Sequence, residues 1–323
     1  MPLALLGVLL LGSSVPAANE FEAIPYGYFK LWTTNRPSGS YVKQPATAAQ
    51  NTIEMVRPGV LLHYGDWRFV YLAHLGRGDT ATLDAYLCLT PEDKALQRME
   101  LGQIHIPAGW ESRTSASWIF TMNRSLVVTK FVGSTYDKGL WTQWTNPWVK
   151  GGYFGAGLFD GAGLDAADKD NNKDFMLGAK APYKDWTFEL TRYWGNGVTG
   201  IHFLEGMAQY QHGPWWGTAE YWTGGRHGKV YGEDYDGAYA LIRYNIAGNV
   251  WTSDRYEYLR VVTPCGCAAT TQQERTTLGL SYELPKSGWR LQTNYEIWSG
   301  DNAPNNFWGA ELQWRWYPWL MGR

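Results

Sequence analysis

Polarity alternates every second residue along much of this chain, in stretches of about ten residues that are separated by turn-forming residues. In the stretch 289–298, one parity carries Trp, Leu, Thr, Tyr and Ile, and the other begins with Arg, Gln, Asn and Glu. The stretch 308–316 repeats the pattern, and shorter ladders occupy 67–75 and 186–190. A period of two is that of a β-strand, and a tilted strand needs roughly 9–11 residues to cross a bilayer. The sequence therefore predicts an all-β chain whose strands are long enough to span a membrane.

The direction of the charged faces follows from the cost of charge in lipid. A basic side chain at the midplane of a membrane barrel costs about 2–4 kcal/mol, so the charged faces should turn inward. A soluble sandwich or propeller would bury the apolar faces instead, and alternation alone does not separate these folds. The sequence has no run of about 20 apolar residues that could span a bilayer as a helix.

Connection lengths favour the membrane barrel. Tight turns alternate with longer polar connections, which is typical of a barrel with short periplasmic turns and longer external loops. Trp67, Trp186 and Trp289 each directly follow a tight turn, which predicts a belt of indoles at one membrane surface. The tight turns are 64–66, 183–185 and 286–288, and the longer connections include 160–174, 223–236 and 264–273.

Sixteen strands result from this scheme, an even number as is usual for closed bacterial barrels. We therefore predict a transmembrane, antiparallel, up-and-down β-barrel without a second domain. The strands are expected near 25–35, 50–63, 67–76, 80–90, 96–106, 137–146, 151–160, 173–181, 186–195, 200–211, 215–223, 236–247, 249–262, 274–284, 289–299 and 307–317.

Charge and aromatic content fit this fold and exclude one class of partner. The formal net charge is −2, so no polycationic surface indicates nucleic-acid binding. Aromatic residues make up 16% of the chain, yet the mean hydropathy is −0.37. This combination is expected where aromatic girdles flank an apolar band and alternate residues face water. A soluble lectin-like domain has the same profile.

A secretory signal pattern lies at the N-terminus. Residues 3–11 form an apolar run, and Val15 and Ala17 occupy the −3 and −1 positions of an A-x-A-like cleavage site. The first six residues contain no Lys or Arg, where such signals normally carry positive charge. We predict a signal peptide at 1–17, a barrel at 18–323 and export to a bacterial outer membrane, where lipid surrounds the barrel.

The longest interruption between predicted strands, 107–136, carries a family resemblance. Residues 101–111 read Leu-Gly-Gln-Ile-His-Ile-Pro-Ala-Gly-Trp-Glu, and Thr114-Ser115 and Arg124-Ser125 follow. This resembles the phosphate-selective porin O and P family, whose members have a similar Leu-Gly-Gln-x-x-x-Pro-x-Gly-x-Glu run, a Thr-Ser and an Arg-Ser. Weaker similarity extends over nearly the whole mature chain, at 57–60, 65–69, 157–161, 172–174, 278–280 and 312–313.

The resemblance implies a sixteen-stranded trimeric porin whose loop at 107–136 folds into the lumen and narrows it. Charges at such a constriction set selectivity. The phosphate-specific members have a dense lysine cluster at this point, which this chain lacks. One carboxylate among three cations predicts passive diffusion of small hydrophilic solutes and ions with a mild preference for anions. The expected constriction residues are Glu111, Arg113, Arg124 and Lys130.

Charged residues on the predicted inward faces are candidates for the lumen wall. Arg255 and Glu257 share a face, and two interpretations are open: they are pore-wall charges, or they form an ion-pair ladder that stiffens the wall. Because both signs occur, we expect a polar and weakly selective wall. The lumen candidates are Arg68, His74, Glu189, Glu220, Arg255, Glu257, Arg290, Glu296 and Arg315.

No cofactor or metal site is predicted. The stretch 168–174 spaces oxygen ligands like a calcium loop, but it has Lys173 at the glycine position and Ala179 at the glutamate position. Cys265 and Cys267 lack the further ligands of a four-ligand site.

Two alternatives to a channel remain open. The sequence contains no Gly-x-Ser-x-Gly elbow and no His-Glu-x-x-His helix, so we predict that the chain is not an enzyme. A barrel hydrolase would need a Ser, a His and an acid converging at its rim. The second alternative is a non-conducting barrel that acts as a scaffold or sheath for a partner protein.

Overall fold

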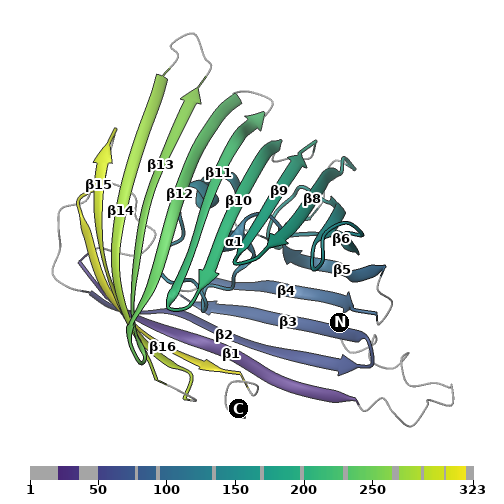
Figure 1. Ribbon diagram of the computed structural model, residues 1–323, viewed down its shortest axis with the longest axis horizontal. Helices are drawn as coiled ribbons and strands as arrows, with labels where there is room; N and C mark the ends of the chain where they lie inside the picture. The colour runs from purple at the N-terminus through teal and green to yellow at the C-terminus, as the bar shows by residue number, and fades with distance from the viewer. Residues whose placement is uncertain are drawn as a thin grey trace.

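The barrel predicted from the sequence is confirmed. Sixteen strands form one closed ring, in which each strand is antiparallel to its neighbours, and β1 and β16 pair to close it (Figure 1). The strands are β1 (Glu22–Thr34), β2 (Gln50–Tyr64), β3 (Trp67–Gly76), β4 (Asp79–Leu89), β5 (Leu96–His105), β6 (Tyr136–Thr145), β7 (Tyr153–Phe159), β8 (Asp174–Tyr183), β9 (Trp186–Trp194), β10 (Ile201–His212), β11 (Trp215–His227), β12 (Gly232–Ala247), β13 (Val250–Thr263), β14 (Ala269–Glu283), β15 (Trp289–Gly300) and β16 (Phe307–Trp316).

The structure is a computed structural model that describes most of the chain. The described residues are 21–35, 50–76, 79–91, 95–132, 136–167, 171–196, 200–227, 232–263, 269–284, 287–301 and 303–317. The expected signal peptide at 1–17 lies outside them, as do Cys265, Cys267 and residues 168–170 of the calcium-like stretch. None of the helices in the described ranges is long and apolar enough to cross a membrane.

Two connections are shorter than the sequence predicted. β11 and β12 extend into 223–236, and β14 begins within 264–273, so that much of the first stretch and part of the second is strand. The backbone continues to pair across these extensions, for example between Arg226 and Glu233. An unpaired backbone N–H or C=O group is costly, so the ladder continues although the side chains suggest a loop.

The outward face of the barrel is apolar and carries a belt of aromatic rings. In β15, residues of one parity are exposed and those of the other are buried, as the alternation predicted. Trp67 and Trp186, which follow tight turns, are 41% and 43% exposed. Trp289 stacks on Trp314, with ring centroids 5.9 Å apart. An apolar band with aromatic ends is the surface that a bilayer requires.

The connection between β5 and β6, called loop L3 below, runs inside the ring. It contains α1 (Trp110–Arg113) and α2 (Leu126–Val132). Figure 1 shows α1 within the ring of strands, and α2 packs against the inner faces of β11, β12 and β13. The fold therefore includes the inward-folding loop that the family resemblance implies.

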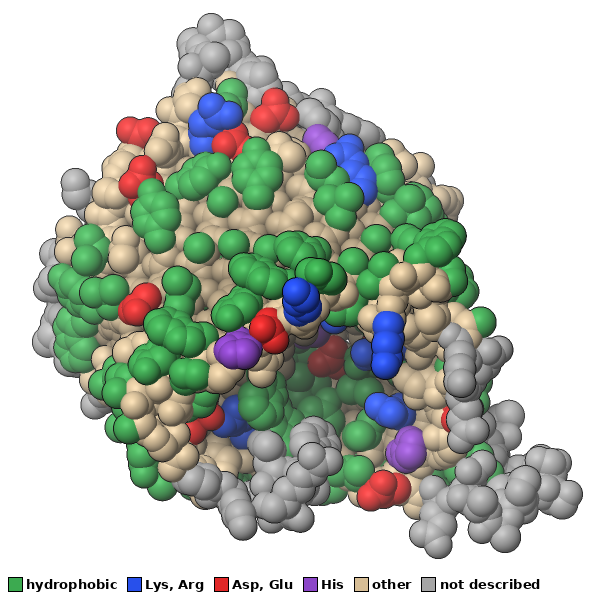
Figure 2. Space-filling view, in the orientation of Figure 1, with side chains coloured by type: hydrophobic (Ala, Val, Ile, Leu, Met, Phe, Trp, Pro, Cys, Tyr) green, Lys and Arg blue, Asp and Glu red, His purple; other side chains and the backbone are tan. Residues whose placement is uncertain are grey.

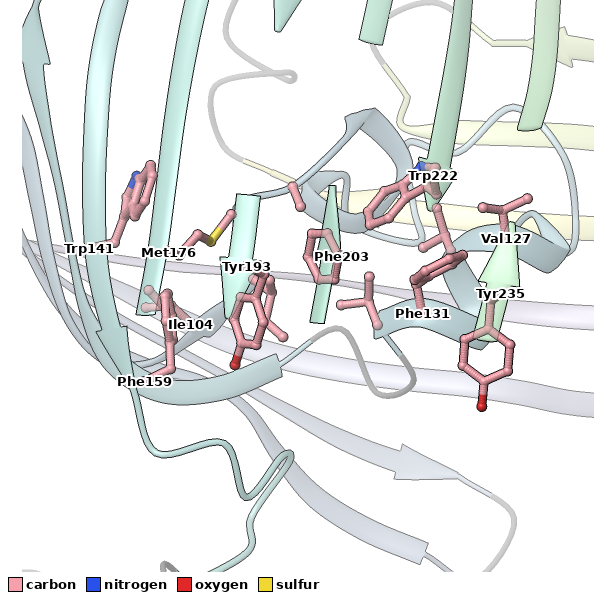
Figure 3. Packing of buried hydrophobic residues seen from close by; sticks show 14 of the residues in the cluster. Ile104, Val127, Phe131, Trp141, Phe159, Met176, Tyr193, Phe203, Trp222 and Tyr235 are labelled. Carbon is pink, nitrogen blue, oxygen red and sulfur yellow. The ribbon is translucent and has the colours of Figure 1, made fainter. Parts of the chain in front are cut away.

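One side of the barrel interior is an aromatic core rather than a wet wall. The ring of Phe131 in α2 lies 5.7 Å from that of Trp222 and 6.2 Å from that of Phe203, and all three side chains are buried (Figure 3). The expectation of a polar inner wall is wrong here, because L3 covers these side chains from within and they face protein instead of water. The same cluster includes Ile104, Val127, Trp141, Phe159, Met176, Tyr193 and Tyr235.

Candidate functional site

A buried chain of ion pairs fixes L3 to the barrel wall. Nη1 of Arg255 in β13 lies 2.7 Å from Oε1 of Glu111 in α1, and Nε of Arg255 lies 3.1 Å from Oε1 of Glu257. The chain continues through Arg275, whose Nε is 2.6 Å from the same Glu257 oxygen and whose Nη1 is 3.5 Å from Glu296. All five side chains are fully buried. Of the two interpretations of Arg255 and Glu257, this geometry has the form of the ion-pair ladder.

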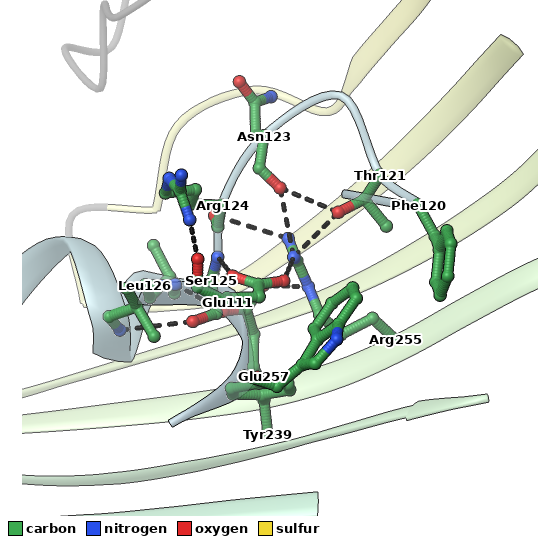
Figure 4. Close-up of polar contacts among 12 residues, drawn as sticks. Glu111, Phe120, Thr121, Asn123, Arg124, Ser125, Leu126, Tyr239, Arg255 and Glu257 are labelled. Carbon is green, nitrogen blue, oxygen red and sulfur yellow. Dashed lines mark hydrogen bonds and ion pairs between the residues drawn. The ribbon is translucent and has the colours of Figure 1, made fainter. Parts of the chain in front are cut away.

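The same ladder also holds the backbone of L3. The Arg255 guanidinium donates to the Thr121 hydroxyl at 2.9 Å and to the Asn123 carbonyl at 3.0 Å (Figure 4). The Glu257 carboxylate accepts a hydrogen bond from the backbone N–H of Leu126, at the start of α2. A carboxylate at a helix N-terminus satisfies a donor that has no partner within the helix.

Two further ion pairs tie L3 to other strands. Nη2 of Arg113 lies 2.7 Å from Oε2 of Glu189 in β9, and Nζ of Lys130 lies 3.2 Å from Oε2 of Glu233 in β12. Burial alone would lower the pKa of the Arg113 guanidinium, but the Glu189 carboxylate raises it above its ordinary value. Glu220 of β11 accepts the backbone N–H of Trp110. Three of the four expected constriction residues therefore have an oppositely charged partner on the barrel wall.

Arg124 is bonded differently from the other three. Its guanidinium donates to the backbone carbonyl of Thr114 at 2.8 Å and to that of Glu111. Within the described part of the chain it forms no ion pair with a carboxylate. Burial lowers the pKa of Arg124; the Glu111 charge opposes this shift, and the Arg57 charge adds to it.

Arg57 of β2 is a site residue that the sequence analysis did not single out. Its Nη1 donates to the Tyr28 hydroxyl at 2.6 Å, and its Nε donates to Nδ1 of His74 at 3.2 Å. The strand register could have indicated this residue. Arg57 lies directly opposite Tyr28 in the β1–β2 ladder, and Tyr28 faces inward.

The remaining lumen candidates lie on the inner wall in different surroundings. Arg290 shares Glu311 with Lys30, at 3.3 and 2.9 Å, and the Arg315 guanidinium lies 4.1 Å from the centroid of the Trp118 ring in L3. Arg68 is exposed, on the face of β3 opposite the outward Trp67. Lys30 and Glu311 were missed, although the alternation in β16 had placed Glu311 inward.

Cation–π and apolar contacts attach the rest of L3 to both sides of the barrel. The Arg243 guanidinium lies 4.1 Å from the ring centroids of both Phe120 and Trp251, which joins L3 to β12 and β13. On the other side, Met122 of L3 packs with Trp32 of β1 and Phe307 of β16. L3 thus crosses the lumen and leaves a narrowed interior. Figure 2 shows one face hollowed, with Lys and Arg side chains at the border of the hollow.

No group of three or more His, Cys, Asp or Glu in the described ranges has an arrangement suited to a metal ion. At the end of the calcium-like stretch, the Asp174 carboxylate accepts hydrogen bonds from the Tyr193 hydroxyl and the Asn196 N–H, both at 2.7 Å. Lys173 pairs with Asp160 at 2.9 Å. Asp174 and Lys173 therefore form local contacts that stabilise the loop and the start of β8.

The closed ring, the inserted loop and the apolar exterior define the class: this is a sixteen-stranded β-barrel with the fold of outer-membrane porins. The sequence itself matches no protein-family model, and no curated protein matches it.

Among solved structures, the chain is similar to a loop-deletion mutant of OmpT, an outer membrane protein of Vibrio cholerae, with a TM-score of 0.70 at 13% identity over 92% of this chain and 99% of that one. It is also similar to an anion-selective porin from Comamonas acidovorans, with a TM-score of 0.66 at 10% identity over 92% and 100%. A third is the outer membrane channel DcaP of Acinetobacter baumannii, with a TM-score of 0.64 at 10% identity over 95% and 100%. At these identities the likeness concerns the fold.

Proposed function

We propose that this chain is a porin of a bacterial outer membrane, through which small hydrophilic solutes and ions diffuse passively with a mild preference for anions. The observation that carries the proposal is loop L3. It enters a closed barrel with an apolar exterior, and it brings Arg124 inside without a carboxylate partner among the described residues. A constricting loop narrows a water-filled path while the wall of the barrel stays intact.

The family motif at 101–111 has a structural explanation in this chain. Gly109 has a φ of 62°, and a Cβ there would collide with the Glu220 carboxylate and lie 2.8 Å from Cζ2 of Trp222. Gly102 has a φ of 132°, and a Cβ there would collide with the Ala85 carbonyl. Both positions therefore need glycine for the approach to L3. We propose kinship with the phosphate-selective porin O and P family in the construction of this loop, together with general rather than phosphate-specific anion transport.

The similar solved structures support a channel and a trimer. One is described as an anion-selective porin, another as an outer membrane channel, and OmpT of Vibrio cholerae is described in a trimer form. We propose that this chain also forms a homotrimer in the outer membrane, with one passage through each barrel.

We further propose that the barrel has no catalytic role and that residues 1–17 are removed on export. The purified protein should be inert in ester and peptide hydrolysis assays. N-terminal sequencing of the membrane-inserted protein should begin at Ala18.

Planar bilayer recording tests the proposed function. The purified, detergent-solubilised protein should produce stepwise increases in conductance that occur in groups of three as trimers insert. A bilayer that stays silent, although the protein inserts as a folded barrel, would refute the porin proposal and favour a scaffold barrel.

A further inference from the structure

Most of the charge that L3 brings into the barrel is cancelled at short range. An opposite charge within hydrogen-bond distance removes most of the field that a passing ion would feel, because the two contributions nearly cancel at a distance. The cancelled groups and their partners are Glu111 with Arg255, Arg113 with Glu189, and Lys130 with Glu233. The charge preference of the passage must therefore come from groups outside these pairs.

On the wall of β15, β16 and β1, one carboxylate offsets part of the charge of three cations, and all four side chains are buried. Glu311 lies between Lys30 and Arg290, and all three side chains have almost no exposed surface. Arg315 stacks on Trp118. These side chains have little exposed surface, so an ion in the passage does not come close to them.

Arg57 differs because its direct partners are neutral. The Tyr28 hydroxyl accepts from its Nη1, and the Tyr28 ring lies 5.5 Å below the guanidinium carbon. Nδ1 of His74 accepts from its Nε, which requires the unprotonated form of that nitrogen. Asp84 of β4 acts on Arg57 electrostatically but forms no ion pair with it among the described contacts. The side chain is held in place while its charge is only partly offset.

Arg124 in L3 and Arg57 on the barrel wall are both guanidinium groups whose direct hydrogen-bond partners are neutral. Neither side chain is fully buried. A guanidinium group that has neutral partners and is partly exposed on the inner side of the barrel attracts an anion and repels a cation.

We infer that Arg57 is a selectivity-determining residue of this channel, and that its positive charge sets the preference for anions. The inference rests on the proposed porin function and deepens it. It moves the origin of selectivity from the ion-paired charges of L3 to the β1–β2 wall.

The test measures reversal potentials of the wild-type protein and three variants in planar bilayers with a salt gradient. Arg57→Gln should lower the anion-to-cation permeability ratio about threefold or more, and Arg57→Glu should reverse the preference, since the interaction of unit charges several ångströms apart in water changes ion occupancy by factors of this size. Arg57→Lys keeps the charge and should keep the ratio near the wild-type value.

A matched control is Arg260→Gln, since Arg260 is an exposed arginine that pairs with Asp236 on the outside of the barrel. It should leave the ratio unchanged. If Arg57→Gln and Arg57→Glu conduct with the wild-type ratio, the inference about Arg57 is overturned while the porin function stands. If the wild-type protein does not conduct at all, the proposed function itself fails.

Discussion

Arg255 in β13 and Glu111 in loop L3 lie 144 positions apart in the sequence, yet their side chains meet at 2.7 Å with no exposed surface. This pair joins the loop that narrows the barrel to the wall opposite its own strands. A buried charge without a partner is strongly unfavourable, so the pair makes the inserted position of L3 depend on both residues.

Breaking this pair should destabilise the barrel. Arg255→Gln leaves the Glu111 carboxylate buried without its cation, which should lower the free energy of unfolding by about 3–5 kcal/mol. Denaturant titration of the protein refolded in lipid vesicles measures the change. Arg260→Gln, which removes an exposed ion pair, should change the unfolding free energy little. Equal losses in the two variants would contradict a role for burial.

The aromatic core should be sensitive to truncation from the L3 side. Phe131→Ala removes a ring that is 1% exposed, and large-to-small changes of this kind cost about 3–5 kcal/mol. We also expect noisier and larger single-channel conductance, because α2 loses its main contact with β10 and β11.

The control for Phe131 is Phe188→Ala, since Phe188 is 46% exposed on the outer face. Lipid chains can occupy the space left there, so stability and conductance should change less. If the outer variant is as unstable as the inner one, the interior of the barrel does not contain a core of the kind described.

Gly109 should be needed for entry of L3 into the lumen. Gly109→Ala adds a Cβ at positive φ and against Glu220 and Trp222, and the added crowding should cost about 1–3 kcal/mol beyond the backbone strain. Gly213→Ala has the same backbone strain, with a φ of 55°, but open space around the new Cβ. Unfolding free energies of the two variants isolate the steric part; equal values would show that the contact with β11 is unimportant.

Charges of L3 that form ion pairs with the barrel wall should have little effect on ion selectivity. The double variant Arg113→Gln/Glu189→Gln removes a cation together with its partner, so the permeability ratio should stay near the wild-type value. Arg124→Gln removes a charge whose partners, among the described residues, are backbone carbonyls, and it should lower the ratio. Reversal potentials of the two variants measure these ratios. A lower ratio in the double variant and an unchanged ratio in Arg124→Gln would show that the paired charges, and not Arg124, contribute to selectivity.

Sequence periodicity was sufficient to predict the barrel and nearly all of its strands. Polarity alternates strictly in strands such as β15 and β16, because their outer face meets an apolar surface and their inner face meets polar groups. The polarity of each residue therefore indicates to which side of the sheet its side chain points. The end of β11 and the starts of β12 and β14 were missed because backbone pairing continues past the point where side-chain alternation ends.

Periodicity could not separate a wet inner face from one covered by protein. Phe203 and Trp222 point inward, against the polar expectation, and only the position of α2 explains them. Arg57 was missed for a related reason. Its importance depends on which charges of L3 are already paired with the wall, and that is decided by tertiary contacts such as Glu111 with Arg255.

The central claim is that ions cross this barrel beside L3 through a passage in which the positive charge of Arg57 favours anions. The most direct measurement is the zero-current potential of the wild-type protein in a planar bilayer separating concentrated from dilute potassium chloride. We predict a stable conductance and a potential whose sign shows that chloride is more permeant than potassium. A potential of the opposite sign, or a folded barrel that carries no current, would contradict the account.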